Sequence, residues 1–254
     1  MDKKYVLTET TREWLGVTLY QIKAVRSFGG VEEGELGGWI ASEENLEHSG
    51  NAWVSGNAWV SGNARVSGDA RVYGNARVYG DAWVSGNAWV YGNARVYGDA
   101  RVYGDARVYG NAWVYGNAWV YGDARVYGNA WVYGDAWVSG NARVYGNARV
   151  YGNARVYGDA WVSGNAWVES SKHIFWASSV GSEDGTLTAY TLKSGEIGVT
   201  RGCFLGTLSE FEAAVNKRHG ESRYAEEYLV LIQYVKLRFR EVTVTVSEGG
   251  DEDA

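Results

Sequence analysis

Apolar residues recur every six positions over nearly half of this chain. Residues 50–169 repeat the unit Gly-(Asn/Asp)-Ala-(Trp/Arg)-Val-(Tyr/Ser) without an insertion, and 120 residues divided by six make twenty units, the last ending in Glu169. Ala and Val stand two positions apart. In an extended strand their side chains therefore point to one side, while the Trp or Arg between them points to the other. Each unit predicts one short strand with an apolar inner side.

The Gly-Asn or Gly-Asp pair predicts a corner after each strand, because Gly accepts positive φ and Asn and Asp tolerate it. A helix is excluded, since each Gly would cost about 1 kcal/mol relative to Ala and a period of six spreads Val around the helix. Such short strands bury little alone, so three units should close a triangle that stacks on the next. At 18 residues per coil, the repeat predicts between six and seven coils, about 30 Å long at ~4.8 Å per coil.

The segment before the repeat continues the same frame. Leu46 occupies the Ala column, and Ile40 lies six residues earlier. We therefore expect the solenoid to begin one or two units before Gly50.

The flanking segments lack the period and predict caps, which a solenoid needs because its two ends expose unpaired backbone. Alternation at residues 17–22 suggests a strand that pairs with another near residues 5–7. The chain is thus mostly β, a triangular parallel β-solenoid between two different ends. Its predicted parts are an N-terminal β cap (1–39), the solenoid (40–169), a C-terminal α+β domain (170–247) and a disordered acidic tail (248–254).

Within the C-terminal part, strands are predicted at 174–180, 186–192 and 197–199. A capping box at Thr207 and Glu210 opens a helix over 209–218, and Gly220 ends it. A second helix over 223–240 carries an apolar stripe that we interpret as core. The stripe consists of Tyr224, Tyr228, Leu231, Ile232, Val235 and Phe239. Residues 242–246 could add a last strand.

Charge is distributed unevenly along the chain. The net charge is −6, with −4 on residues 1–49 (five basic, nine acidic), −4 on residues 170–254 (nine basic, thirteen acidic) and +2 on the repeat. All ten cations of the repeat are Arg. The modest positive charge and the pI near 5.2 argue against long duplex DNA, whose binding depends on many neutralised phosphates.

The compartment follows from what the sequence lacks. A single cysteine, Cys203, excludes an intramolecular disulfide and fits a reducing compartment. No segment approaches the roughly 20 apolar residues that a membrane span needs. The sequence therefore predicts a cytoplasmic protein with no membrane partner.

Catalytic chemistry is not expected. The three histidines, His48, His173 and His219, come from separate segments, and none lies within the repeat. Zinc sites and general acid–base catalysis need clustered ligands or paired groups, so we predict no enzyme, no metal and no cofactor. Cys203 is expected to pack beside Phe204, since no partner is spaced to activate it. Asp99 and Asp105 belong to different corners and are not expected to bind calcium.

The outward residues carry the candidate function. If three units make a coil, every eighteenth residue stacks, and each face becomes a ladder of guanidinium and indole groups. On one face the expected order is Trp59, Arg77, Arg95, Trp113, Trp131, Arg149, Trp167; on another it is Arg65, Trp83, Arg101, Trp119, Trp137, Arg155; the third runs Trp53, Arg71, Trp89, Arg107, Arg125, Arg143, Trp161. The candidate binding residues are Arg77, Arg95, Trp113, Trp131, Arg149, Arg101, Trp119 and Trp137.

Two interpretations of these ladders stay open. Arg over Trp at one-coil spacing is a cation–π contact of about 0.5–1 kcal/mol, so one interpretation is that the ladders stabilise the stack. Ten Trp and thirteen Tyr pointing outward also form large apolar patches, which usually mark partners. Trp, Tyr and Arg dominate interface hot spots.

The repeat resembles the hexapeptide repeats of left-handed parallel β-helix proteins, in which an aliphatic residue is followed four positions later by a small one, as Val54 is by Ala58. It departs from that pattern in having Tyr or Ser directly after Val. The resemblance implies a left-handed coil, and a trimer is common in that family. The chain also resembles phage and prophage proteins built on Gly-Asn-Ala-Arg-Val-Tyr units, with a Leu-Gly-Gly-Trp-Ile lead-in (36–40) and a Gly-Cys-Phe-x-Gly-Thr segment (202–207). That likeness implies no particular activity.

Together these features predict a phage or prophage accessory protein that engages a host protein or nucleic acid through its Arg/Trp/Tyr faces. One alternative is an anti-defence protein that sequesters a signalling nucleotide. This alternative predicts a pocket between subunits or where the solenoid meets residues 174–207. The other is a self-assembling scaffold, a dimer or trimer with Trp-lined self-contacts.

Overall fold

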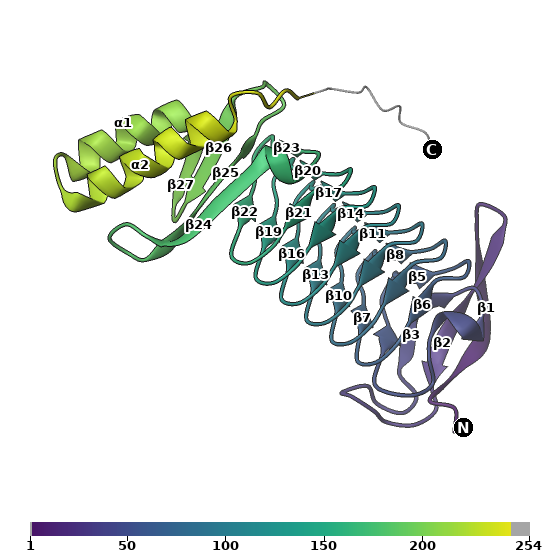
Figure 1. Ribbon diagram of the computed structural model, residues 1–254. Coiled ribbons are helices and arrows are strands. Elements are labelled where there is room, and N and C mark those ends of the chain that lie inside the picture. Colours follow the sequence, from purple (N-terminus) through teal and green to yellow (C-terminus); the bar gives the residue numbers. More distant parts are fainter. Residues whose placement is uncertain (1, 245–254) are drawn as a thin grey trace.

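The computed structural model describes residues 2–244. A hairpin at the N-terminal end, a stack of triangular coils and a sheet with two helices follow one another along the molecule (Figure 1). The outline is therefore the capped solenoid that the period predicts.

Each hexapeptide forms a two-residue strand of Trp-Val or Arg-Val, and strands 18 residues apart pair in parallel, as Trp113 does with Trp131. Three faces result. Face 1 contains β5 (Trp59–Val60), β8 (Arg77–Val78), β11 (Arg95–Val96), β14 (Trp113–Val114), β17 (Trp131–Val132), β20 (Arg149–Val150) and β23 (Trp167–Val168). Face 2 contains β4 (Trp53–Val54), β7 (Arg71–Val72), β10 (Trp89–Val90), β13 (Arg107–Val108), β16 (Arg125–Val126), β19 (Arg143–Val144) and β22 (Trp161–Val162). Face 3 contains β6 (Arg65–Val66), β9 (Trp83–Val84), β12 (Arg101–Val102), β15 (Trp119–Val120), β18 (Trp137–Val138) and β21 (Arg155–Val156).

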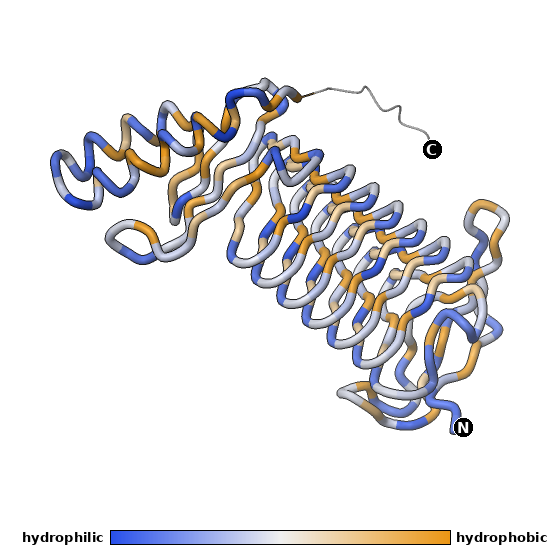
Figure 2. Tube along the Cα trace, viewed as in Figure 1, coloured by the Kyte–Doolittle hydropathy of each residue, from blue (hydrophilic) through white to orange (hydrophobic). Residues whose placement is uncertain are grey.

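The core of the coils is made of the Ala and Val columns. From Ala52 to Val168 every Ala and Val of the repeat is 0% exposed, and the hydrophobic positions lie in register from coil to coil (Figure 2). The prediction that these two positions point inward is confirmed. Alternation along each strand is sufficient for this, because one side of every strand faces the axis of the triangle.

The corners carry polar ladders. The corner before face 1 contains only Asn, and each amide Nδ2 donates to the Oδ1 of the Asn one coil further on, as Asn93 does to Asn111 at 3.1 Å. The same contacts join Asn57, Asn75, Asn93, Asn111, Asn129, Asn147 and Asn165. Such ladders reinforce in-register stacking. The corners before faces 2 and 3 mix Asn with Asp.

The N-terminal cap is the hairpin of β1 (Tyr5–Trp14) and β2 (Val17–Ala24), followed by β3 (Leu36–Ile40), which extends face 1. The expected pairing is confirmed, with Leu7 opposite Ile22. The expected frame before the repeat is wrong by two residues, because Ile40 pairs with Val60 and Leu46 with Val66. Both side chains extend the Val column.

The shift arises because Leu46 and Val54 lie eight residues apart, two more than one repeat unit, whereas Ile40 and Leu46 keep the spacing of six. Asn45 lies in the short 3-10 helix Glu43–Asn45 before Leu46. Its buried amide donates to the carbonyls of Gly62 and Ala64, both at 2.9 Å, in place of a backbone strand. The solenoid still begins before Gly50, as expected.

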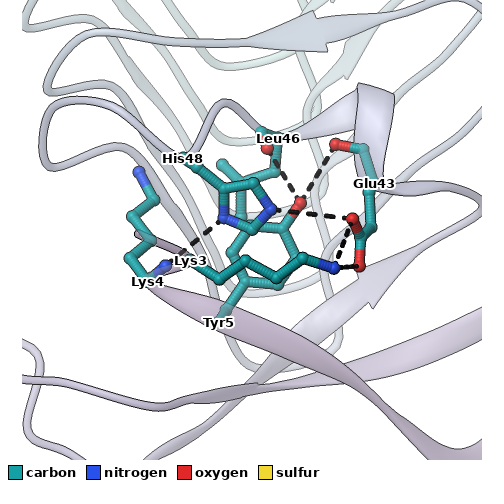
Figure 3. A network of polar contacts seen from close by, with 6 residues as sticks. All are labelled: Lys3, Lys4, Tyr5, Glu43, Leu46 and His48. Atoms are coloured by element: carbon teal, nitrogen blue, oxygen red, sulfur yellow. Dashed lines mark hydrogen bonds and ion pairs between the residues drawn. The ribbon is translucent and has the colours of Figure 1, made fainter. Parts of the chain in front are cut away.

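A polar network fastens the first strand across the first coil (Figure 3). The buried Tyr5 hydroxyl donates to the carbonyl oxygens of Leu46 and Glu43, at 2.8 and 3.1 Å. The Lys3 ammonium lies 2.7 Å from the Glu43 carboxylate, and the His48 ring stacks on Tyr5 at 4.3 Å. Desolvation lowers the pKa of His48, while Glu43 opposes that shift.

Lys4 is a buried cation in this cap. It is 0% exposed, and its ammonium donates to the carbonyls of Ser49 and Gly50 at 3.2 and 3.4 Å. Burial lowers the pKa of Lys4 to about 8. Between about pH 8 and pH 10.5 the unfolded chain therefore binds more protons at Lys4 than the folded chain does. The contribution of Lys4 to the free energy of unfolding thus becomes more favourable to the folded state as the pH rises through this window.

We expect Lys4→Met to remove this dependence. The stability of wild type relative to Lys4→Met should improve by about 1–3 kcal/mol between about pH 7 and about pH 9.5. Thermal melts of both proteins at the two pH values measure it. A constant difference between them would show that Lys4 does not titrate in this window.

The C-terminal domain contains β24 (Ile174–Val180), β25 (Gly185–Thr191), β26 (Ile197–Arg201) and β27 (Phe204–Thr207) in one antiparallel sheet, after the 3-10 helix Ser171–His173. The helices α1 (Leu208–His219) and α2 (Arg223–Arg238) lie on the side of the sheet that faces away from the coils (Figure 1). The capping box and the stop at Gly220 are confirmed.

The strand β25 covers the last coil. The Thr188 hydroxyl accepts from the Trp161 backbone N–H at 3.0 Å, the Thr191 hydroxyl donates to the Trp167 carbonyl, and Ala166 bridges to Leu192. These contacts pair backbone groups that the final coil would otherwise expose.

Several expectations for this domain are corrected. Cys203 is exposed, because it lies in the tight turn between β26 and β27, a strand that was not expected. Tyr224 is 42% exposed, whereas Ala225 is buried, because the first turn of α2 rotates Ala225 toward the sheet. Residues 242–244 form no strand, and the proposed tail at 248–254 lies outside the described residues. Within residues 2–244, no helix is long and apolar enough to cross a membrane.

Candidate functional site

The arginines and tryptophans of face 1 form one continuous stack. The Arg95 guanidinium lies 4.6 Å from the Trp113 ring, and the Trp113 and Trp131 rings stack at 4.9 Å with an interplanar angle of 4°. The Arg149 guanidinium follows, 4.3 Å from Trp131 and 4.7 Å from Trp167. The coil spacing of the strands fixes these distances, so the predicted column order is confirmed.

Face 3 repeats the same order. Arg101 lies 5.1 Å from Trp119, and Trp119 stacks on Trp137 at 5.2 Å and 6°. Arg155 then lies 4.5 Å from Trp137. Each of these two faces therefore has a pair of stacked indoles between two guanidinium groups.

Arg77 differs from the other candidate residues. Its guanidinium lies 4.5 Å from the Trp14 ring of the N-terminal hairpin and 5.9 Å from Trp59. Burial lowers the pKa of Arg77. The structure thus places Arg77 under the cap, apart from the open part of face 1.

The number of exposed indoles is lower than the sequence suggests. Trp53, Trp59 and Trp167 are only 2%, 7% and 5% exposed, because the two caps cover the ends of the stack. The expectation that all ten repeat tryptophans point into solvent is therefore wrong at these three positions. Trp113, Trp131, Trp119 and Trp137 are half-buried along the open part of their faces.

Tyrosine forms a second column on the same faces, because Tyr stands two positions after the Trp or Arg. Tyr79, Tyr97, Tyr115, Tyr133 and Tyr151 stack at 4.8–5.1 Å on face 1. Tyr115 also meets the edge of Trp131 at 6.4 Å. Burial raises the pKa of Tyr115 and of Tyr133, and raises the pKa of Tyr151 to about 12. These phenols remain neutral donors at physiological pH.

The ring geometry constrains what the faces can bind. Rings that stack along the solenoid axis use both π-faces on their neighbours and present their edges to solvent. Nucleobase stacking requires a free π-face, so the middle of a ladder does not offer one. Edges, phenol hydroxyls and guanidinium N–H groups stay available to a partner.

Charge separates the three faces. From Asn57 to Tyr151, the corner, outward and tyrosine columns of face 1 contain Arg but no carboxylate; Glu169 follows at the end. The corners before faces 2 and 3 contain seven Asp, among them Asp105 and Asp123 beside Arg107 and Arg125. Among residues 2–244, none of the four ion pairs involves a repeat arginine. These columns of face 1 therefore carry a net positive charge, which Asp81, Asp99 and Asp135 border at the corner that follows.

Metal ligands do not gather in the part of the chain that the structure describes, where no group of three or more His, Cys, Asp or Glu could hold an ion. His48 and His173 lie at opposite ends of the solenoid, and the His173 ring bonds to the Ser170 hydroxyl at 2.9 Å. The three histidines are thus not brought together.

Ten segments of the chain, most of them overlapping, match one protein-family model and together cover residues 70–86 and 88–170. That model is described as YdcK Beta solenoid repeat. Each match spans 17 residues, close to one coil, and matches begin at Ala positions of all three faces. The three faces differ in the side chains at their outward positions. No curated protein matches the chain.

Sequence reasoning missed several residues at the junction between face 3 and the C-terminal domain. A cavity of about 620 Å³ lies there, lined by Trp137, Ser139, Arg155, Tyr157, Trp176 and Arg238, among others. The sequence contains one indication of this site, which is Ser139. It is the only serine of the repeat with Tyr one coil before it and one coil after it, at Tyr121 and Tyr157.

Proposed function

We propose that this chain is a non-catalytic binding protein whose face 1 docks on an acidic surface of a partner protein. The observation that supports it is the stack of Arg95, Trp113, Trp131 and Arg149 on a face whose outward column contains no carboxylate. The likeness to phage and prophage proteins at residues 36–40 and 202–207 supports an accessory role directed at a host partner.

Ring orientation favours a protein partner over a single-stranded nucleic acid. The indole faces of Trp113 and Trp131 are already covered by each other and by Arg95 and Arg149. Bases would lack a stacking surface there, whereas half-buried Trp, Tyr and Arg side chains are the groups that dominate protein interfaces. Carboxylates of the partner would meet the guanidinium N–H groups.

The same charges argue against face 1 as a self-association surface. A twofold axis between Trp113 and Trp131 would place Arg95 of one copy opposite Arg149 of the other. The outward column of face 1 contains no carboxylate to compensate, and like charges at an interface cost several kcal/mol. An acidic partner removes this repulsion, so a different chain fits face 1 better than a second copy.

The test compares two quadruple variants. Replacing Arg95, Trp113, Trp131 and Arg149 by Ser should weaken capture of the partner from a host lysate roughly tenfold or more, because hot-spot losses reach about 2 kcal/mol. The matched control replaces Trp89, Arg107, Arg143 and Trp161 of face 2, which also form two cation–π pairs. Circular dichroism checks that both variants keep the fold.

Capture is measured by quantitative mass spectrometry of the retained proteins. Equal capture by the wild type and the face 1 variant would show that the ladders are structural. Capture that disappears after nuclease treatment would identify a nucleic acid as the partner and contradict the protein proposal.

A second candidate function is sequestration of a signalling nucleotide, as an anti-defence protein would perform it. One observation favours it, namely the aromatic and Arg-lined cavity at the junction with the C-terminal domain. Release of a bound nucleotide on denaturing the purified protein, detected by mass spectrometry, tests it.

A further inference from the structure

The tyrosine column of face 3 lacks one rung. Tyr103 and Tyr121 stack at 5.0 Å and 2°, but the next position in the column is Ser139, and Tyr157 follows one coil later. Tyr121 and Tyr157 are thus two coils apart, roughly 10 Å at ~4.8 Å per coil. The columns of faces 1 and 2 have no such gap between tyrosines.

This gap opens into the cavity of about 620 Å³ described above. The volume is within the range of small-molecule sites. Trp137 forms one wall, and Tyr157, which is 52% exposed, meets Trp176 of β24 edge-on at 4.3 Å. A planar ring above Ser139 would lie about 5 Å from the rung on either side, the distance at which the tyrosines of this protein stack on one another.

The charge of the cavity is positive. Its two ionic lining groups are Arg155 and Arg238, and no lining residue is acidic. Arg155 is exposed and contacts the Trp137 ring at 4.5 Å. The Arg238 guanidinium donates from one nitrogen, Nη2, to the carbonyls of Ser171 and Ile174 at 2.9 and 3.3 Å. Guanidinium groups beside an aromatic slot suit a ligand that carries both a planar ring and a phosphate group.

We propose that the vacant rung at Ser139 binds a nucleoside monophosphate. The base inserts between Tyr121 and Tyr157 as the missing member of the ladder, and the phosphate is held by Arg155 and Arg238. This proposal rests on the second candidate function. The site is separate from face 1, so an experiment that contradicts nucleotide binding at Ser139 leaves the docking proposal for face 1 untouched. The indoles of face 1 are covered on both sides, whereas Tyr121 stacks on one ring among the described residues, that of Tyr103.

The test uses a substitution that the repeat itself supplies. Ser139→Tyr fills the rung with the residue found at the equivalent position of most coils, so it should close the site without lowering the thermal midpoint. Titration calorimetry with AMP and with GMP should show binding to the wild type and a loss of about tenfold or more in affinity for Ser139→Tyr. The matched control is Ser85→Tyr, which adds a tyrosine to the same column next to Tyr103 and should bind normally.

A second variant separates the phosphate contact from the stacking contact. Arg155→Gln should weaken AMP and GMP binding about tenfold while leaving the weaker binding of adenosine and guanosine unchanged. The proposal is overturned if neither nucleotide binds the wild type, or if Ser139→Tyr binds them as tightly as wild type. Partner capture by Ser139→Tyr should remain normal, because face 1 is unchanged.

Discussion

The Val114→Asp variant is expected to lose the solenoid fold at ordinary temperature. Val114 is 0% exposed at the middle of face 1, between Val96 and Val132 of the neighbouring coils. A carboxyl group there has no partner, whether charged or protonated, and burying it costs several kcal/mol. Each coil contacts only its neighbours, so a break at β14 separates the coils before it from those after it.

The matched control is Trp113→Asp, one residue away but directed outward. It removes the stack with Trp131 and the contact with Arg95, so we expect a loss of about 1–2 kcal/mol with the fold retained. Far-UV circular dichroism and thermal melts of both variants measure the difference. Similar melts for the two would contradict the inward assignment of Val114.

Gly110→Ala is expected to destabilise the protein by about 2–4 kcal/mol. Gly110 has φ +72°, and a Cβ there would lie 3.0 Å from the backbone nitrogen and 3.1 Å from the carbonyl oxygen of Gly128 in the next coil. The substitution therefore combines strain in the left-handed region with a contact that only backbone movement can relieve. Coils above and below hold that backbone in place.

Gly164→Ala separates these two causes. Gly164 has a similar φ of +63°, but a Cβ there would meet nothing within 4 Å, because no further repeat corner stacks on it. We expect a loss of about 1 kcal/mol from strain alone. The free energy of unfolding from urea titrations compares the two variants, and equal losses would show that the approach of Gly110 to Gly128 is unimportant.

Much of the solenoid can be read from its six-residue unit. Ala and Val alternate with Trp or Arg over a strand too short for any other arrangement, so the inward column follows from the period of two alone. Stacking at 18 residues then determines which outward residues become neighbours, and the order of Arg95, Trp113, Trp131 and Arg149 follows by counting. Each of these steps depends on local geometry or on the nearest coil.

The structure at the two ends of the solenoid could not be predicted from the repeat. Burial of Trp53, Trp59 and Trp167, and the contact of Arg77 with Trp14, depend on how non-repeating segments dock on the coils. The two-residue shift at Leu46 arises from two extra residues between Leu46 and Val54, which the hexapeptide frame does not anticipate.

The sequence by itself thus determined the coil, its core and the order of its ladders, because these depend on contacts between identical neighbours. Only the tertiary structure decided which parts of the faces stay open, that Cys203 is exposed, and that the gap at Ser139 meets Trp176 and Arg238 in one cavity. Those features bring together segments far apart in the chain. No repeat period relates them, so their positions depend on the packing of the C-terminal sheet against the final coils.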